Sequence, residues 1–297
     1  MPSIVGVVIV TFGGIQRTRV CLDSLRTTTF RDFDVVVVDN ASADGTVETI
    51  ARDYPEVVLL CQAENLGYAG GNNAGIRYCL ERGYRSVLIL NNDTVVAPDL
   101  LKRMCTQLES ADVVVPQVFS LEEPPRVVTR AGSFDWKRGR FVNLRDLGGT
   151  AVAETPRLVN LAGGCCLLIS RAVFEEIGLL DERFFLYYED FDFLARARAA
   201  GFRLLFEPRA VVYHAVSSSS GGEGTNPLRL YYNCRNRLLF MKKNGALKLP
   251  FLGWFLTTRV LYTAAYVLSG RASLALATWR GVWDFFSGRL GPARYAS

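Results

Sequence analysis

The chain has 297 residues, of which 49% are hydrophobic and 21% are charged. These values are typical of a soluble globular protein, and they exclude a disordered chain, a coiled coil and a collagen-like repeat. The seven cysteines form no C-x-x-C pair, which argues against a zinc framework or a disulfide scaffold and favours reduced thiols in the cytoplasm. Met1–Val10 has no basic region and no cleavage site, so we expect a buried strand there instead of a signal peptide.

Charge divides the chain into two regions. Residues 1–222 hold 23 Lys and Arg against 27 Asp and Glu, and residues 223–297 hold 11 basic and 2 acidic residues, so charges of −4 and +9 give the total of +5. We therefore expect an enzyme-sized domain over residues 1–222 and a basic, apolar helical region over residues 223–297. Such a region suits an anionic membrane surface or a phosphate-bearing partner. Nucleic acid is a poorer alternative, since the sequence has no recognition helix, zinc finger or RNA-binding signature.

Apolar, β-branched runs alternate with helical patterns over the first 115 residues. Strands are expected at Ile4–Val10, Asp34–Val38, Val57–Leu60, Ser86–Leu90 and Asp112–Val115. Helices are expected at Ile15–Arg26, Asp44–Arg52, Gly71–Glu81 and Pro98–Leu108. This order predicts an α/β fold with a mainly parallel central sheet and helices on both faces. Ligands bind such sheets outside the carboxyl ends of the strands.

The alternation stops after Val115. The sequence then predicts a hairpin at Ser133–Val142, a buried strand at Gly163–Ser170, a helix at Tyr188–Arg198, short strands at Arg203–Phe206 and Ala210–Tyr213, and a flexible linker at Ser217–Gly224. Further on, Leu249–Gly270 contains one charged residue, Arg259. Its length permits a transmembrane helix, but the central arginine favours a helix that lies in the membrane interface. A helix packed on the domain is an equal alternative.

Four polar clusters follow the predicted strands at the ligand edge of the sheet. They are Thr11-Phe12, Asp39–Ser42, Asn65–Asn73 and Asn91–Thr94. We expect their Asp and Asn side chains to bind a nucleoside, Phe12 to stack on its base, and the helix that opens at Gly70-Gly71 to direct amides at phosphate oxygens. For any one cluster, a turn or a helix cap is an equal alternative.

Three acidic or basic features could carry chemistry. Asp93 ends the fourth predicted strand and is a candidate ligand for Mg²⁺ or Mn²⁺, which commonly takes one or two carboxylates and substrate phosphates; the alternative is a helix cap. The acidic run Glu189–Asp192 is a candidate general base, because crowded carboxylates raise each other's pKa; the alternative is an exposed first helical turn. His214 is the only histidine, and we expect it near the metal or in a packing role.

Together these segments resemble glycosyltransferase family 2, the inverting nucleotide-sugar enzymes of GT-A fold, and its rhamnosyltransferase-like group. The resemblance covers about residues 4–240. The matching segments are Val8–Phe12, Val37–Thr46, Asn65–Ile76, Leu90–Thr94, Gly163–Arg171 and Tyr188–Arg196 with His214. Asn91 stands where many relatives carry the first acid of the DxD motif, which weakens the expectation of tight metal binding.

The resemblance implies transfer of a sugar, first of all rhamnose from dTDP-rhamnose, to a saccharide or polyprenyl-diphosphate-linked acceptor in cell-surface polysaccharide synthesis. It divides the domain into a nucleotide-sugar half, residues 1–115, and an acceptor half, residues 116–222, and it favours the cytoplasm or the inner membrane face. Asp190 is the implied base, and Asp93 and His214 are the implied ligands of Mg²⁺ or Mn²⁺. The implied nucleotide contacts are Thr11, Phe12, Asp39, Asn65, Gly71, Asn72, Asn92 and Asp93. Weaker acceptor or phosphate contacts are Glu189, Trp136 and Arg235.

Three alternatives stay open at this point. A UDP-sugar-dependent hexosyl or furanosyl transferase uses the same motifs with another donor. A nucleotidyltransferase also places a metal-binding Asp on an α/β sheet, although Gly13–Arg19 is a poor match to its glycine-rich signature. A non-catalytic sugar-binding protein is the third alternative, against which the intact Asp39, Asp93 and Asp190 argue.

Overall fold

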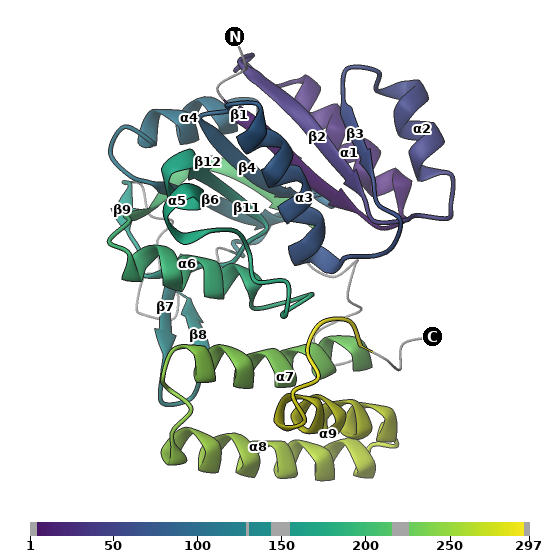
Figure 1. Cartoon of the computed structure of the whole chain (residues 1–297), viewed down its shortest axis with the longest axis vertical. Helices are drawn as coiled ribbons and strands as arrows, with labels where there is room; N and C mark the ends of the chain where they lie inside the picture. The colour runs from purple at the N-terminus through teal and green to yellow at the C-terminus, as the bar shows by residue number, and fades with distance from the viewer. Residues whose placement is uncertain (1–4, 129–130, 144–154, 216–225, 294–297) are drawn as a thin grey trace.

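The computed structural model describes residues 5–128, 131–143, 155–215 and 226–293 (Figure 1). The predicted linker at Ser217–Gly224 lies outside these residues. The strands are β1 (Val5–Thr11), β2 (Phe33–Asp39), β3 (Val58–Cys61), β4 (Ser86–Asn91), β5 (Thr94–Val96), β6 (Val113–Ser120), β7 (Ala131–Asp135), β8 (Arg140–Asn143), β9 (Arg157–Leu158), β10 (Leu161–Ala162), β11 (Cys166–Ser170) and β12 (Leu204–His214). The helices are α1 (Ile15–Arg26), α2 (Thr46–Asp53), α3 (Gly67–Glu81), α4 (Leu100–Gln107), α5 (Arg171–Ile177), α6 (Glu189–Ala199), α7 (Pro227–Lys243), α8 (Leu249–Leu268) and α9 (Ala272–Phe286).

The part of the sheet that carries the polar clusters is built around β1. This strand pairs in parallel with β2 and β4, and β2 pairs in parallel with β3. The register sets Thr11 beside Asp39 and Val10 beside Asn91. Because all four strands run the same way, the clusters that follow them meet at one edge of the sheet, as the sequence predicts.

The rest of the sheet is mixed. β11 lies antiparallel between β4 and β6, while β12 pairs in parallel with β6 and antiparallel with β5. The strands predicted at Arg203–Phe206 and Ala210–Tyr213 form one strand, β12, whose register shifts between Glu207 and Val211. The pairing of β12 with β5 sets His214 opposite Thr94, next to Asp93. The antiparallel additions therefore bring the only histidine to the predicted ligand edge.

Two apolar clusters cover the two faces of the sheet. Side chains of α1, α2 and α4 pack on one face, and those of α3, α5 and α6 pack on the other. In β1 the side chains alternate, so that Val7 and Ile9 join the first cluster while Val8 joins the second. Burial on both faces explains why these strands are apolar without interruption.

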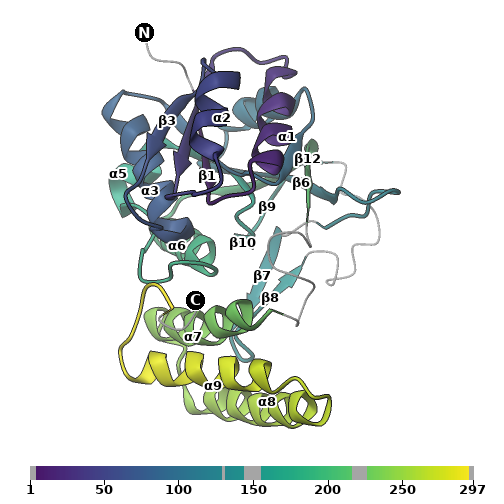
Figure 2. The ribbon, with the colours of Figure 1, turned by 90° about the vertical axis from the view of Figure 1, so that its right-hand side faces the viewer.

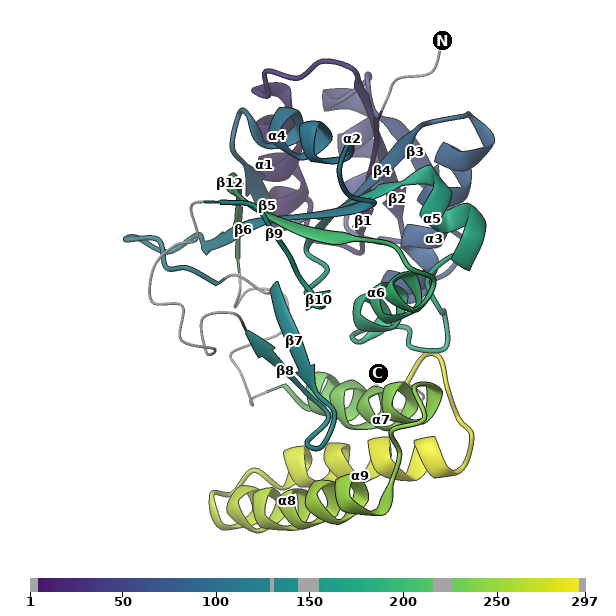
Figure 3. The ribbon, with the colours of Figure 1, turned by 90° about the vertical axis from the view of Figure 1, so that its left-hand side faces the viewer.

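Helices α7, α8 and α9 form a separate layer below the sheet (Figure 1). The hairpin β7–β8 extends from the sheet domain to α7 (Figures 2 and 3), where Trp136 stacks on Phe240 with ring centroids 5.6 Å apart. Within the described residues, α8 is a helix whose length and mean hydropathy of 1.2 would allow it to cross a membrane, and 11% of that span is buried. The layer is thus attached to the domain on one side and presents α8 on the other.

Two polar side chains of α7, Arg235 and Asn236, are fully buried. The Asn236 amide donates to three carbonyl groups of segment 184–187, each at 2.8 Å. The Arg235 guanidinium donates to two carbonyls of segment 183–184 and to that of Gly291, which follows α9. The expectation that Arg235 contacts a phosphate is therefore wrong, because its side chain has no exposed surface and its guanidinium donates to backbone carbonyls and to the Asn236 side chain.

We expect Asn236→Ala to lower the free energy of unfolding by about 3 kcal/mol, because the carbonyl groups of Leu186 and Tyr187 would lose a donor and that of Phe184 would keep the one from Arg235. Thermal or denaturant unfolding measures the change. Asn233→Ala is the matched control: Asn233 is partly exposed on the same helix and, within the described part of the chain, donates only to the Arg229 carbonyl one turn earlier. A loss for Asn236→Ala no larger than that of the control would contradict the role assigned to the buried amide.

Candidate functional site

The predicted nucleoside pocket begins at the carboxyl ends of β1 and β2. Asp39 is buried; its Oδ2 accepts a hydrogen bond from the Ser42 amide at 2.9 Å, and its Oδ1 has no partner among the described residues. A buried carboxylate oxygen without a donor is costly unless a ligand supplies one. Asp39 is therefore able to accept a hydrogen bond from a nucleoside base.

Two neighbours of Asp39 differ in how open they are. Thr11 is buried, and its hydroxyl lies 3.1 Å from that of Thr18 and 3.3 Å from the Asn92 amide, which also donates to Thr18. Phe12 is 63% exposed, an unusual exposure for a phenylalanine beside a polar pocket. Thr11 and Asn92 are thus joined by hydrogen bonds beside Asp39, while the exposed Phe12 ring is free to stack on a base.

The start of α3 differs from the expectation. The helix begins at Gly67, not at Gly71, and the amides of Tyr68 and Ala69 donate to the Phe185 carbonyl. Asn65 accepts a hydrogen bond from the Gly67 amide at 2.8 Å. The first amides of the helix are therefore occupied by protein acceptors and do not face a phosphate.

Gly71 and Asn72 are buried within α3 and do not line an open surface. A Cβ atom at Gly71 would lie 2.7 Å from Cγ1 of Val10 and 2.9 Å from Nδ2 of Asn40, so glycine allows α3 to pack against β1. Asn72 donates to the Tyr68 carbonyl at 2.8 Å. Gly71 thus has a packing role. The nucleotide contacts of Asn72, whose Oδ1 is buried without a partner among the described residues, and of the partly exposed Asn65 stay predictions.

Asp93 and His214, the predicted metal ligands, lie next to each other in the structure, and their role as ligands stays a prediction. Oδ1 of Asp93 lies 3.0 Å from Nε2 of His214, and the Ala215 amide donates to the Asp93 carbonyl at 3.0 Å. Both side chains are nearly buried, at 3% and 12% exposure for Asp93 and His214. The antiparallel pairing of β12 with β5 fixes this approach.

The donor set fits a small divalent cation. Mg²⁺ prefers octahedral ligands at about 2.0–2.1 Å, which places adjacent ligands roughly 3 Å apart, the separation found between Asp93 and His214. In the part of the chain that the structure describes, no group of three His, Cys, Asp or Glu side chains could hold a metal. Two protein ligands leave the other positions to substrate phosphates and water, as is usual for Mg²⁺.

A hydrogen-bonded chain links this pair to the predicted base. The Tyr68 hydroxyl donates to Asn91 Oδ1 at 2.7 Å and lies 3.1 Å from the Gly164 carbonyl. Asn91 Nδ2 lies 3.4 Å from His214 Nε2, and the Gly164 amide donates to Asp190 Oδ2 at 2.7 Å. Asn91, which stands where many relatives carry the first acid of the DxD motif, thus contacts His214.

Sequence reasoning missed Tyr68 and Gly164. A Cβ atom at Gly164 would lie 2.6 Å from Cβ of Asp190, so this position requires glycine for the approach of α6. The signals were present in the sequence, as an aromatic residue inside the Asn65–Asn73 cluster and as the glycine pair before the strand. Burial raises the pKa of Tyr68 well above its usual range, and the charges of Glu189 and Asp190 add to the effect.

The three carboxylates of the acidic run have different surroundings. Asp192 is buried and pairs with Arg196 at 3.0 Å and Lys243 at 2.6 Å, so it is a structural residue. Glu189 is buried with Oε2 unpaired in the described chain. Burial, and then the charge of Asp190, holds the pKa of Glu189 well above the usual range of a carboxyl. Asp190 is partly exposed and is the acid best placed to meet an acceptor.

Trp136 lies where an acceptor is expected, on the hairpin next to α7. It is 44% exposed and belongs to a group of aromatic rings with Phe134 and Phe240. One face is thus used in packing, and stacking on an acceptor sugar stays a prediction.

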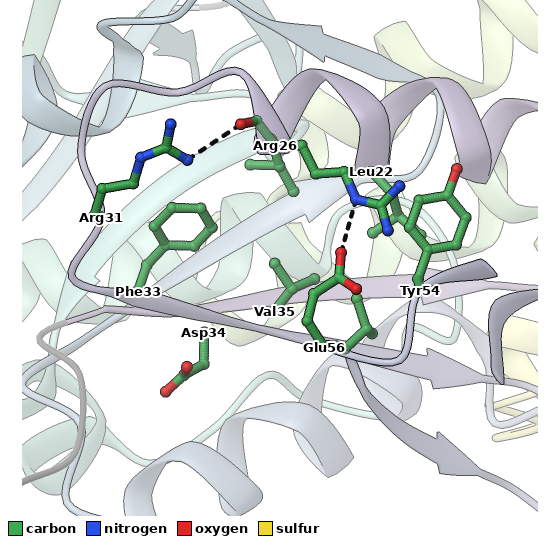
Figure 4. A pocket seen from close by; sticks show the side chains of 10 residues that line it. Leu22, Arg26, Arg31, Phe33, Asp34, Val35, Tyr54 and Glu56 are labelled. Carbon is green, nitrogen blue, oxygen red and sulfur yellow. Dashed lines mark hydrogen bonds and ion pairs between the residues drawn. The ribbon is translucent and has the colours of Figure 1, made fainter. Parts of the chain in front are cut away.

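A cavity of about 240 Å³ lies away from these residues (Figure 4). Residues at the amino end of β2 line it, including Phe33 and Asp34, together with Arg26, which pairs with Glu56 at 2.7 Å. The predicted site is at the opposite end of the same strand, since β2 ends at Asp39. The cavity is therefore not part of that site.

Comparison with known proteins identifies the family. The family model described as glycosyl transferase family 2 matches residues 6–178. An N-acetylglucosaminyl-diphospho-decaprenol L-rhamnosyltransferase from Mycobacterium tuberculosis is 28% identical over 280 residues, which are 86% of this chain and 90% of that protein. A dTDP-rhamnosyl transferase from Shigella flexneri is 27% identical over 216 residues, 71% of each chain. A low-salt glycan biosynthesis hexosyltransferase from Haloferax volcanii is 35% identical over 169 residues, 56% of this chain and only about half, 53%, of that protein.

A solved structure shows the same fold. A mannosyltransferase from Pyrobaculum calidifontis, in complex with GDP-Man and Mn²⁺, superposes with a TM-score of 0.60 at 17% identity, over 97% of this chain and 88% of that one. The mixed central sheet with helices on both faces is accordingly a GT-A fold, as the sequence predicts. With more than half of its length matched by the family model, the chain belongs to glycosyltransferase family 2.

Proposed function

We propose that the chain transfers a sugar, with inversion, from a nucleotide diphosphate to a lipid-linked saccharide, in the synthesis of a cell-surface polysaccharide. The observation that carries the proposal is the approach of Asp93 to His214 at the carboxyl end of β4, joined through Tyr68 and Gly164 to Asp190. A metal-binding pair and a candidate base thus share one edge of the sheet.

The donor would bind between β1 and β2. Asp39 accepts a hydrogen bond from the base through its unpaired Oδ1, Phe12 stacks on the ring, and Thr11 and Asn92 support the pocket wall. Asp93 and His214 would hold Mg²⁺ or Mn²⁺, which neutralises charge on the diphosphate when it is bound. The reacting sugar would then lie near the Tyr68–Gly164 contact, on the side of Asp190.

In the proposed reaction, Asp190 accepts the proton of an acceptor hydroxyl as the hydroxyl oxygen attacks the anomeric carbon. The bond between that carbon and the diphosphate oxygen breaks, and the nucleotide diphosphate leaves with the bonding electrons. One displacement inverts the anomeric centre, and no enzyme nucleophile is required. The amides of Gly164 and Phe191 donate to Oδ2 and Oδ1 of Asp190, each at 2.7 Å, and orient the carboxylate.

Two relatives whose names specify rhamnose transfer make dTDP-rhamnose the first candidate donor. The Haloferax volcanii hexosyltransferase keeps a UDP-linked hexose as the second candidate. The name of the Mycobacterium tuberculosis relative specifies a diphospho-decaprenol acceptor, which supports a polyprenyl-diphosphate-linked saccharide here. Membership of the family argues against the nucleotidyltransferase alternative.

Calorimetric titration with dTDP, UDP, GDP and NAD, each with and without Mn²⁺, tests the donor site. We expect dTDP or UDP to bind about tenfold more tightly with Mn²⁺, and Asp93→Asn to remove that enhancement, because one of two protein ligands is lost. Asp99→Asn is the control: Asp99 is an acid just before α4 and pairs with Arg103. Binding of NAD alone, or of no nucleotide at all, would contradict the proposed donor class.

Asp190→Asn should leave binding of the nucleotide within about twofold and lower the transfer rate by at least about 10³, because the amide cannot take the proton. Turnover of the donor in the presence of acceptor measures the rate. Asp192→Asn tests the neighbouring acid, whose partners are Arg196 and Lys243, and it should affect folding stability more than chemistry. Transfer retained by the Asp190 variant would assign the base to another residue.

We further propose that the helical layer binds the inner face of the cytoplasmic membrane. Large apolar side chains of α8 and α9 are exposed on this layer: Leu249, Leu256, Val260, Leu261, Tyr262, Val267, Leu268, Leu276, Trp283 and Phe286. So large an apolar surface is unusual on a soluble monomer, and the net charge of +9 in this region suits anionic lipids. Phe251 and Phe255 are buried against the rest of the layer, which favours a helix that lies on the membrane over one that crosses it.

Leu261→Glu combined with Leu268→Glu should reduce binding to phosphatidylglycerol vesicles at least about tenfold, since two exposed leucines would no longer enter the lipid. Vesicle sedimentation measures the binding. Leu158→Glu, a change at a 63% exposed leucine of β9, is the control and should bind as the unmodified chain does. Point changes are preferable to truncation because Arg235 bonds Gly291 beyond α9. Equal binding of all three proteins would contradict the membrane proposal.

A further inference from the structure

Two arginines on neighbouring helices, Arg237 of α7 and Arg259 of α8, lie together inside the helical layer. Their guanidinium carbons are 5.6 and 5.3 Å from the centroid of one ring, that of Phe255. Neither forms an ion pair with a carboxylate of the described residues, and the Nε atom of each is buried without a hydrogen-bond acceptor there. Two cations thus share a partly buried space without a described counter-charge.

The contacts that these arginines do make leave donors unused. Arg237 donates to the Arg138 carbonyl of the hairpin turn, and its guanidinium lies 4.9 Å from the Trp254 ring centroid. Arg259 donates to the Cys234 sulfur at 3.6 Å, and a thiol is a weak acceptor. Aromatic faces attract a guanidinium group, but they do not accept hydrogen bonds from the N–H groups that point outward in its plane. Both side chains therefore lack an anion that could accept these hydrogen bonds.

The local charge is positive. Burial lowers the pKa of Arg237, and the charges of Arg259 and Arg140 lower it further, while Tyr188 and Cys234 act in the opposite direction. Arg140 is exposed on β8 and directly follows Gly139, where a Cβ atom would lie 3.2 Å from Nε of Arg237. Like charges held together at low exposure destabilise a fold unless an anion neutralises them. The cluster formed by Arg140, Arg237 and Arg259 therefore has the properties of an anion site.

The position of this arginine cluster relates it to the acceptor. Tyr188 directly precedes the helix that carries Asp190. Burial raises the pKa of Tyr188 to about 12, and the positive charges of Arg237 and Arg259 act to lower it. On the face of α8 opposite Arg259, the helix presents the exposed leucines Leu261 and Leu268, which are two and nine residues farther along the helix. The cluster thus lies between the candidate base and the surface proposed to contact lipid.

We propose that Arg237 and Arg259, with Arg140 at the rim, bind the diphosphate group of a lipid-linked acceptor. This inference rests on the proposed function, and it names the part of the site that recognises the acceptor. In such a molecule the diphosphate joins the lipid to the sugar. If the lipid contacts α8 and the sugar lies at Asp190, the diphosphate must lie between them, and an anion site is needed there. The planar guanidinium suits this task because its paired N–H groups bind two phosphate oxygens together.

Farnesyl diphosphate is a suitable probe because it combines a prenyl chain with a diphosphate and carries no sugar. We expect calorimetric titration to detect its binding to the full chain, and Arg237→Gln and Arg259→Gln each to weaken that binding by about tenfold or more. Arg271→Gln is the matched control: it removes the same charge from the same layer, at the exposed turn between α8 and α9, and should stay within about twofold.

Further titrations separate the sources of the anion. All variants should bind dTDP or UDP with Mn²⁺ equally well. If no protein, including the unmodified chain, binds these nucleotides, the result contradicts the proposed function. The binding of farnesyl diphosphate still decides whether the arginine cluster is an anion site. Equal farnesyl diphosphate binding by Arg259→Gln, Arg237→Gln and the unmodified chain would overturn the inference. The inference would also be overturned if these variants lost as much binding to phosphatidylglycerol vesicles as to farnesyl diphosphate. The cluster would then be a general contact for lipid headgroups. Should Arg237→Gln fail to fold, Arg259→Gln decides, because its guanidinium bonds only the Cys234 sulfur among the described residues.

Discussion

The segment from Arg183 to Tyr188 determines how the two halves of the site meet. Three of its residues other than glycine, Phe185, Tyr187 and Tyr188, have positive φ angles of 63°, 69° and 74°. Such angles are unfavourable for residues with a Cβ atom and persist only where surrounding contacts hold them. Here the buried amide of Asn236 binds three carbonyl groups of the segment, and that network of hydrogen bonds offsets the strain.

The same segment connects three helices that come from distant parts of the sequence. The Phe185 carbonyl accepts the first amides of α3, Gly67 allows the close approach of Phe185 with a φ of 72°, and Tyr188 is the residue before α6. Asn236 of α7 completes the connection. The C-terminal layer is therefore part of the site's support, because without α7 the chain between α5 and α6 would lack the donors that fix the direction of Asp190.

Much of this arrangement is predictable from the sequence, for physical reasons. Parallel strands end at one edge, so Thr11, Asp39 and Asn91 could be placed together from the order of elements alone, and the structure confirms that placement. The direction of β11 was not predictable, because a short apolar run has the same pattern in either direction. The start of α3 was placed four residues late, since Gly67 precedes the glycine pair and its left-handed φ is fixed by contact with Phe185, far away in the sequence.

Neighbouring positions on α7 show a further limit of a sequence pattern. Arg235, Asn236 and Arg237 are consecutive, and composition alone gives no reason to separate the two arginines. On a helix, consecutive residues are about 100° apart, so Arg235 enters the interior while Arg237 turns toward the hairpin and α8. Which arginine is available to an anion depends on tertiary packing and was not readable from the motif.

The proposed mechanism involves two diphosphates, and the structure offers a different chemistry for each. In this proposal the donor diphosphate is the leaving group, and it gains negative charge as the glycosidic bond breaks, so a divalent cation held by Asp93 and His214 would stabilise the transition state more than the ground state. The acceptor diphosphate keeps its charge throughout the reaction, so strong stabilisation there would strengthen binding without increasing the rate. Guanidinium groups, each with one charge and a fixed fork of donors, suit that second task, because they orient the acceptor and release the product more readily than a metal would. The separation of Asp93 and His214 at the sheet edge from Arg237 and Arg259 in the helical layer follows this difference in chemical role.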